Sequence, residues 1–167
     1  MPSYTVTPIA NLWVSTNRGL AFLESSDSAD ELNARLVFEA LPEKKQDMVR
    51  SRFDHWLQGN KHDKYFHGWP NNPTYKDCFV FKWKDKRQHQ RLYGFLTHPR
   101  PLTAAWFMAC ILVSHAQKNR EETDPSELNG ANRLRIDAAV IKAVRLAYRT
   151  ILKERKYYGQ TLDRRKY

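Results

Sequence analysis

Several side chains of this protein could act together on a phosphodiester. Arg91 is the first choice for a phosphate clamp, because its planar guanidinium can donate two hydrogen bonds to phosphate oxygens, and Lys82 and Lys84 are the second choice. His115 is the candidate general acid or base, because an imidazole can change its charge near neutral pH. Tyr93 could stack on a base or pass a proton. Together these groups could bind a phosphate and move a proton beside it.

Two further cations follow in the chain, and each candidate also has a plainer interpretation. Lys118 and Arg120 could hold a flanking phosphate backbone. A single histidine at the end of a strand is more often a hydrogen-bonded structural residue, and Arg91 on a sheet face could equally form a cross-strand salt bridge. Tyr93 could simply be packed. No metal-ligand cluster or Gly-rich phosphate loop is present, so we expect neither a metal nor a cofactor.

Three predicted strands, over residues 77–84, 89–98 and 106–115, must position these groups. Alternation with a period of two sends the aromatic side chains of the first strand to one face and its lysines to the other. Antiparallel pairing with the second strand would then collect four candidates on one face: Lys82, Lys84, Arg91 and Tyr93. The third strand is almost continuously apolar, which is typical of a strand covered on both sides, and it ends at His115, beside that face.

Two helices are expected before these strands. Ser28 to Glu31 matches a capping box, and Leu32, Leu36, Val37 and Ala40 would form the buried stripe of a helix that ends near Leu41. Pro42 suits the first turn of a second helix, which Gly59 would end. This helix hairpin would cover the aromatic face of the sheet. Residues 4–23 predict a hairpin or a single edge strand with a loose lead-in.

The remaining segments are a loop and a C-terminal helix. The loop over residues 60–75 contains many aromatic side chains, which could pack on one another or stack on RNA bases. Asp124-Pro-Ser-Glu127 predicts a helix start, and the helix would run to about Lys156, with a possible break at Gly130 or within 135–138. Cys78 and Cys110 are expected to be reduced thiols in the core.

Charge and length limit the class of protein. The 167 residues carry a net charge of +10, while residues 1–41 carry −3, so the rest carries +13. An acidic partner is therefore expected, and nucleic acid is the commonest one. Neither a signal peptide nor a membrane span is apparent, so we expect a cytoplasmic protein with no membrane partner.

This order of segments resembles the RelE/ParE superfamily of toxins, and within it the HigB-like, phage-derived branch. The likeness covers roughly residues 20–135 and depends on Arg91-Leu-Tyr-Gly-Phe95, on Ser114-His115, and on a late motif that reads Lys118-Asn-Arg120, Thr123-Asp-Pro125, Glu127-Leu128 and Ala131. Three features depart from the family pattern. The helix motif is one residue shorter, and the chain carries an N-terminal lead-in and a long C-terminal helix that compact members lack. Gln117 replaces the usual aromatic residue after the histidine, and the usual basic pair falls on Asn119-Arg120.

The resemblance implies an α+β fold, in which a small twisted antiparallel sheet packs against an N-terminal helix hairpin, with an extra C-terminal helix. It divides the chain into a RelE-like domain over residues 1–125 and a helical extension with a basic tail over residues 126–167. It also implies a toxin of a type II toxin–antitoxin system, an endoribonuclease that cleaves messenger RNA on the ribosome through attack by the ribose 2′-hydroxyl. In such a site Lys118 and Arg120 would bind the RNA backbone beside the cleaved bond. A cognate antitoxin, of the helix-turn-helix kind, would silence it.

Two other functions remain open from the sequence. One is a non-enzymatic protein of the same superfamily, which inhibits a protein target such as gyrase or serves as an interaction module. The long helical tail and the altered basic pair favour this alternative. The other is a basic nucleic-acid-binding protein without catalytic activity.

Overall fold

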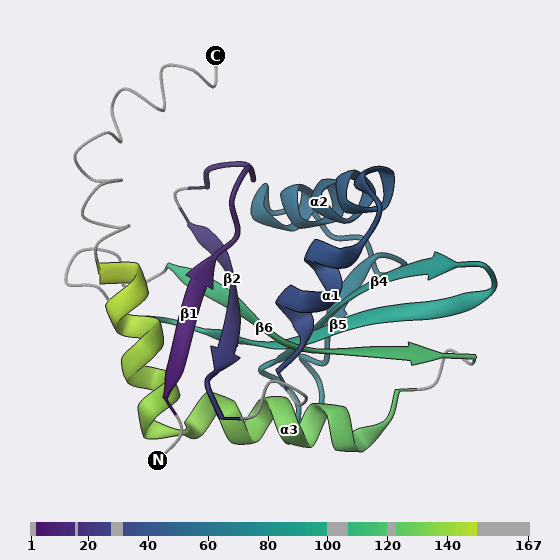
Figure 1. Cartoon of the computed structure of the whole chain (residues 1–167). Helices are drawn as coiled ribbons and strands as arrows, with labels where there is room; N and C mark the ends of the chain where they lie inside the picture. The colour runs from purple at the N-terminus through teal and green to yellow at the C-terminus, as the bar shows by residue number, and fades with distance from the viewer. Residues whose placement is uncertain (1–2, 16, 28–31, 100–106, 120–122, 150–167) are drawn as a thin grey trace.

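A single mixed sheet of six strands organises the protein (Figure 1). The computed structural model describes all residues except 1–2, 16, 28–31, 100–106, 120–122 and 150–167. The strands are β1 (Tyr4–Pro8), β2 (Arg18–Ser25), β3 (Phe66–Gly68), β4 (Cys78–Asp85), β5 (Gln88–Thr97) and β6 (Met108–Lys118). Their order in the sheet is β1-β2-β6-β5-β4-β3. Neighbouring strands are antiparallel, except that β2 and β6 are parallel.

The predicted fold class, a small antiparallel sheet against an N-terminal helix hairpin, is wrong. Two strands precede the first helix, and β2 lies beside β6 in parallel, with Leu20 opposite Cys110. Every residue from Gly19 to Leu23 is buried, which is expected of a strand inside a sheet covered on both faces. Of the two alternatives that the sequence left open for residues 4–23, the structure contains the hairpin, because β1 pairs antiparallel with β2. The parallel pairing of β2 with β6 was not predicted.

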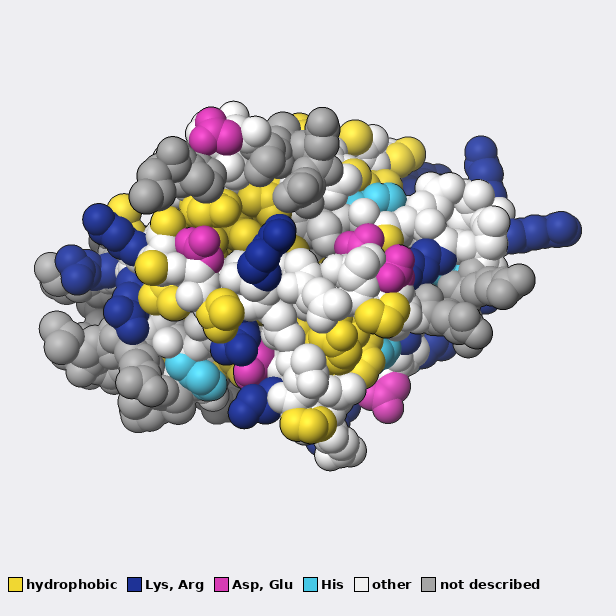
Figure 2. Space-filling model, turned by 90° about the horizontal axis from the view of Figure 1, so that it is seen from below, with side chains coloured by type: hydrophobic (Ala, Val, Ile, Leu, Met, Phe, Trp, Pro, Cys, Tyr) yellow, Lys and Arg dark blue, Asp and Glu magenta, His cyan; other side chains and the backbone are white. Residues whose placement is uncertain are grey.

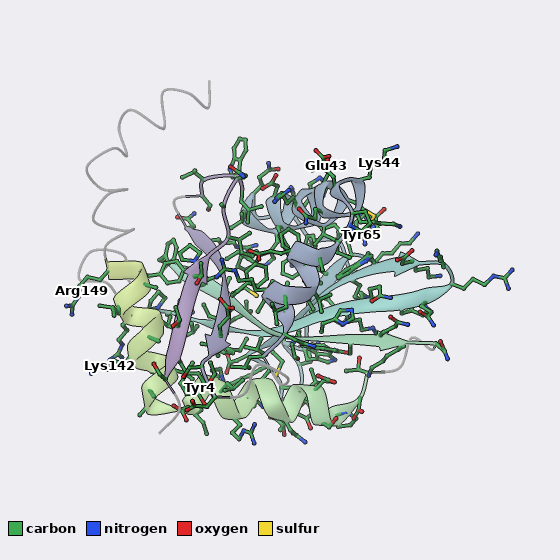
Figure 3. The ribbon with its side chains drawn as sticks, viewed as in Figure 1. Tyr4, Glu43, Lys44, Tyr65, Lys142 and Arg149 are labelled. Atoms are coloured by element: carbon green, nitrogen blue, oxygen red, sulfur yellow. The ribbon has the colours of Figure 1, made fainter. Side chains whose placement is uncertain are left out.

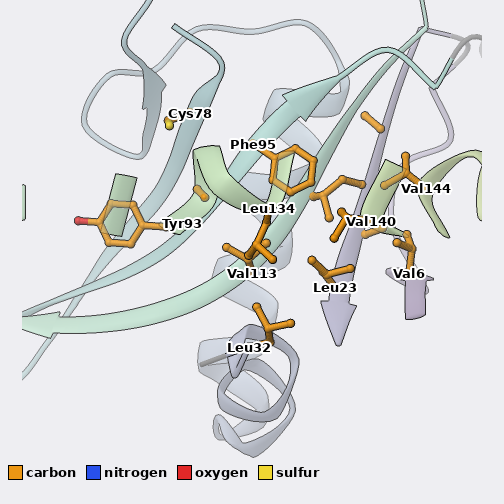
Figure 4. Packing of buried hydrophobic residues seen from close by; sticks show 14 of the residues in the cluster. Val6, Leu23, Leu32, Cys78, Tyr93, Phe95, Val113, Leu134, Val140 and Val144 are labelled. Carbon is orange, nitrogen blue, oxygen red and sulfur yellow. The ribbon is translucent and has the colours of Figure 1, made fainter. Parts of the chain in front are cut away.

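Helices cover both faces of the sheet. On one face lie α1 (Ala34–Ala40) and α2 (Glu43–Leu57), and on the other lie α3 (Pro125–Ile136) and a further helix over residues 138–149. The first face packs mainly aromatic side chains, among them Phe38, Phe53, Trp56, Phe79 and Phe81. The second face packs smaller side chains together with Tyr93 and Phe95 (Figure 4). The last helix belongs to this second core, because Val140, Val144 and Tyr148 are buried in it.

The helix hairpin exists, but only part of its predicted packing is correct. α2 follows Pro42 and ends before Gly59, whose φ of 87° is the left-handed conformation typical of a helix stop. In α1 the buried residues are Ala34 and Phe38, whereas the predicted stripe residue Leu36 is 56% exposed. The capping box at residues 28–31 lies outside the described residues.

The predicted helix start and break after the sheet are confirmed. The side chain of Asp124 caps α3 by accepting a hydrogen bond from the backbone N–H of Ser126 at 2.9 Å. α3 ends at Ile136, and Asp137 then caps the next helix by accepting from the N–H of Ala139 at 2.8 Å. The break therefore falls within 135–138 and not at Gly130. The tail over residues 150–167 lies outside the described residues.

The two cysteines are free and buried, as predicted, and they lie in the cores on opposite faces of the sheet. Burial raises the pKa of Cys78 to about 11 and raises that of Cys110 as well. Both thiols are therefore protonated and unreactive at neutral pH. In the described part of the chain, no helix has the length and apolar character needed to cross a membrane.

Candidate nucleic-acid interface

At one end of the sheet β4, β5 and β6 extend past the helices (Figure 1). The strand register places several basic side chains on one face there. In the β4–β5 register, Lys82 lies opposite Arg91 and Lys84 lies opposite His89, while β6 places Lys118 opposite His89. These five side chains share the face that α3 covers farther along the strands. We call them, together with His67, the basic sheet end. The predicted grouping of Lys82, Lys84, Arg91 and Tyr93 on one face is confirmed.

Arg91 is held beneath this surface. Only 3% of the residue is exposed, and its Nη1 donates to Thr123 Oγ1 at 3.1 Å and to the Tyr93 hydroxyl at 3.4 Å. Thr123 directly precedes the residue that caps α3, so the guanidinium ties the start of α3 to the sheet. Tyr93 is fully buried in the same core. This geometry favours a positioning role for Arg91 and Tyr93 over direct contact with a ligand.

His115 points to the opposite face of the sheet from Arg91. Its register partner is Leu92, and its Nε2 lies 2.6 Å from Gln90 Oε1 on the aromatic side. The cause is a β-bulge: Gly94 pairs with Leu112 and Tyr93 pairs with Ser114, so β6 contains one extra residue. One extra residue inverts the alternation beyond it. The expected position of His115 beside the basic face is therefore wrong.

The surroundings of His115 are those of a structural side chain. Its backbone N–H donates to Asn33 Oδ1 at 2.9 Å, and its ring centroid lies 6.2 Å from that of Trp83. Burial lowers the pKa of its imidazole, which is therefore neutral at physiological pH. His115 also lines a cleft of about 320 Å³ between β6 and α3, together with Ser114, Glu127 and Arg133.

A different imidazole lies on the cationic face. His67, in β3, pairs with Val80, which places its side chain on the same face as Lys82. Burial lowers its pKa most strongly, and the positive charges of Lys82 and Arg91 lower it further. Nδ1 lies 3.1 Å from its neighbour's carbonyl oxygen, Gly68 O, so this nitrogen donates and Nε2 is the acceptor. A neutral imidazole with an acceptor nitrogen can take up a proton, as a general base must.

Sequence reasoning assigned His67 to the aromatic loop and not to the site. β3 has only three residues, too few for alternation to predict a strand. Within the loop the rings pack on protein groups: His62 stacks on Tyr65 with centroids 3.9 Å apart, and the Arg52 guanidinium lies 4.0 Å from the Tyr65 ring. The one signal for a strand was an apolar and aromatic run interrupted by His67 and followed by Gly68.

The remaining predicted RNA contacts lie at the edge of the basic sheet end. Lys84 is exposed, and Lys118 Nζ lies 5.9 Å from the centre of the Tyr93 ring. Arg120 lies outside the described residues. Figure 2, seen from the side of α3, shows basic side chains spread among hydrophobic and acidic ones over that part of the surface. The positive charge on this side of the protein is therefore not one continuous patch. Its most regular arrangement is at the ends of β4, β5 and β6, where the strand register spaces the basic side chains.

Comparison with known proteins identifies no relative. No protein-family model matches the chain, and neither a curated protein nor a solved structure is significantly similar to it.

Proposed function

We propose that this protein is a toxin of a toxin–antitoxin pair, an endoribonuclease that cleaves messenger RNA on the ribosome. The observation that carries the proposal is the basic sheet end, where a neutral imidazole and several cations share one face. The resemblance of residues 91–95 and 114–131 to the RelE/ParE superfamily supports the same function from the sequence.

The proposed reaction needs three contributions from the protein. A base must take the proton of the ribose 2′-hydroxyl, and Nε2 of His67 is suited to this step because the imidazole is neutral. Positive groups must stabilise the additional charge on the phosphorane, and Lys82 and Lys84 face the same side as His67. A proton must reach the departing 5′-oxygen, which the ammonium group of Lys82 can donate.

The buried members of the site support the others. Arg91 lies directly opposite Lys82 on the same face, and like charges in this position repel. A phosphate bound over Lys82 would reduce this repulsion. Arg91 also fixes Thr123 and Tyr93, so we assign it a positioning role and not a catalytic one.

The test is cleavage of a messenger RNA by the purified full-length chain with and without ribosomes, with mapping of transcript ends. We expect cleavage only with ribosomes. His67→Gln should lower the rate about 100-fold or more, because loss of a general base typically has an effect of this size. Lys82→Gln should also lower it about 100-fold. Lys142→Gln, an exposed change on the last helix, is the matched control and should retain the parental rate.

Comparison with His115→Gln decides between the two imidazoles. If His115→Gln abolishes cleavage in a folded protein while His67→Gln does not, the basic sheet end is not the catalytic face. DNA damage without transcript cleavage would instead indicate an inhibitor of a protein such as gyrase. Salt-sensitive RNA binding without growth arrest would indicate a nucleic-acid-binding protein.

A further inference from the structure

The turn that joins β4 and β5 has an unfavourable backbone for the residues it contains. Asp85 pairs with Gln88, so the turn consists of Lys86 and Arg87 alone. Their φ angles are 50° and 74°, both in the left-handed region. A two-residue turn with positive φ at both positions is a type I′ turn, for which Asn-Gly is the preferred sequence. Lysine and arginine at these positions strain the backbone.

The strain falls at an exposed basic end of the sheet. Lys84, Lys86 and Arg87 are all exposed at the end of the hairpin, and Figure 1 shows that this hairpin projects beyond the helices. Asp85, the last residue of β4 before the turn, is acidic, and its Oδ1 lies 3.8 Å from Lys45 Nζ of α2. The tip therefore keeps a net positive charge.

Neighbouring contacts hold the strained tip in a defined position. Gln117 Nε2 of β6 donates to Gln88 Oε1, next to the turn, and the Lys45–Asp85 ion pair joins the turn to α2. Pairing of β5 with β6 continues to His89 and Lys118. The basic side chains of the tip are thus presented by a supported ribbon, and a strained backbone that its surroundings maintain is a mark of a functional position.

We propose that the β4–β5 tip is an RNA-docking element that contacts the phosphate backbone through Lys84, Lys86 and Arg87. Lys82 and Lys84 lie two residues apart on one face, about 7 Å along the strand, so their positive charge repeats along the ribbon. A repeating series of cations suits a repeating anion such as a phosphodiester chain. This inference depends on the proposed function in taking RNA as the polymer. It extends the contact from Lys84, already part of the proposed site, to Lys86 and Arg87, which lie outside the proposed catalytic groups.

The test compares three double variants of the full-length chain. Lys86→Asn with Arg87→Gly removes both the charge and the strain. Lys86→Gln with Arg87→Gln removes the charge and keeps the strain. Lys142→Gln with Arg149→Gln is the matched control, because it also removes two exposed charges, from the outer side of the last helix (Figure 3). Each is measured by thermal unfolding and by titration of a fluorescent RNA hairpin at several salt concentrations.

Stability and RNA affinity should change in opposite directions for the Asn-Gly variant. We expect its melting temperature to rise by about 2 to 4 °C, since the strain is relieved. Its affinity for RNA should fall at least about tenfold at low salt, and the slope of log K against log salt should decrease by about 1.5 to 2. The Gln-Gln variant should lose the same affinity without the gain in melting temperature. The control should lose less than about threefold in affinity.

The outcomes separate this inference from the proposed function. If the tip variants bind RNA as the parent does, or no more weakly than the control, the docking role is refuted, even when the parent cleaves transcripts. If the parent cleaves no transcript but the tip variants lose RNA binding as expected, the docking role stands and the proposed function fails. If the parent binds no RNA, both are refuted, and an acidic protein becomes the partner to seek.

Discussion

Gly94 of β5 lies close against the backbone of β6, and replacing it with alanine should strongly destabilise the protein. An added Cβ would lie 2.2 Å from the carbonyl oxygen of Ile111 and 2.9 Å from its carbonyl carbon. An ordinary carbon–oxygen contact is about 3.3 Å, so the two strands would have to separate by about 1 Å. Backbone atoms of a central strand cannot move aside as a flexible side chain can.

The expected loss follows from this overlap. Overpacking of a well-packed interior costs typically about 1 to 3 kcal/mol, and a clash with backbone belongs at the upper end. We therefore expect Gly94→Ala to lower the free energy of unfolding by about 3 kcal/mol, a large part of the 5 to 15 kcal/mol typical of a domain. Urea denaturation followed by far-UV circular dichroism measures this change.

Gly130 provides the matched control. A Cβ at this position of α3 would meet no atom within 4 Å. Gly130→Ala should therefore stabilise the protein by about 0.5 to 1 kcal/mol, because alanine loses less conformational entropy in a helix. A loss of less than about 1 kcal/mol in Gly94→Ala, with an unchanged denaturant slope, would refute the close approach of β5 and β6.

Three other predictions concern the buried groups. Burial lowers the pKa of His67 and His115, so the unfolded chain takes up protons more readily. The free energy of unfolding should therefore fall as pH drops below about 6.5. In the double variant His67→Gln, His115→Gln it should fall less steeply with pH, and the same slope in parent and variant would contradict this. Cys78 and Cys110 should react with an aromatic disulfide reagent only after denaturant is added, and rapid reaction of the folded protein would disprove their burial. Phe53→Ala should cost about 3 to 5 kcal/mol in urea unfolding, because its fully buried ring packs edge-on against a neighbouring ring; a cost below about 1 kcal/mol would contradict this packing.

Local sequence patterns correctly predicted those elements that depend on residues close together in the chain. Alternation correctly separated the lysines of β4 from its aromatic residues, because each residue in a regular strand faces away from the next. The end of α2 just before Gly59 also followed from the residue types there. The helix break at Asp137 falls within the second of the two places that the sequence offered. The apolar run of β6 correctly predicted burial on both faces.

The tertiary structure alone decided which imidazole joins the cations. A simple alternation along β6 would have directed His115 to the same face as Arg91. The extra residue opposite Tyr93 and Gly94 reverses it, and a bulge arises from pairing with another strand and not from local sequence. His67 lies on the cationic face because the three residues of β3 pair with β4. That pairing joins segments too far apart in the sequence for a local pattern to predict it. The sequence thus determined the chemical groups and the regular elements, whereas strand register, a property of paired strands, determined which of these groups meet.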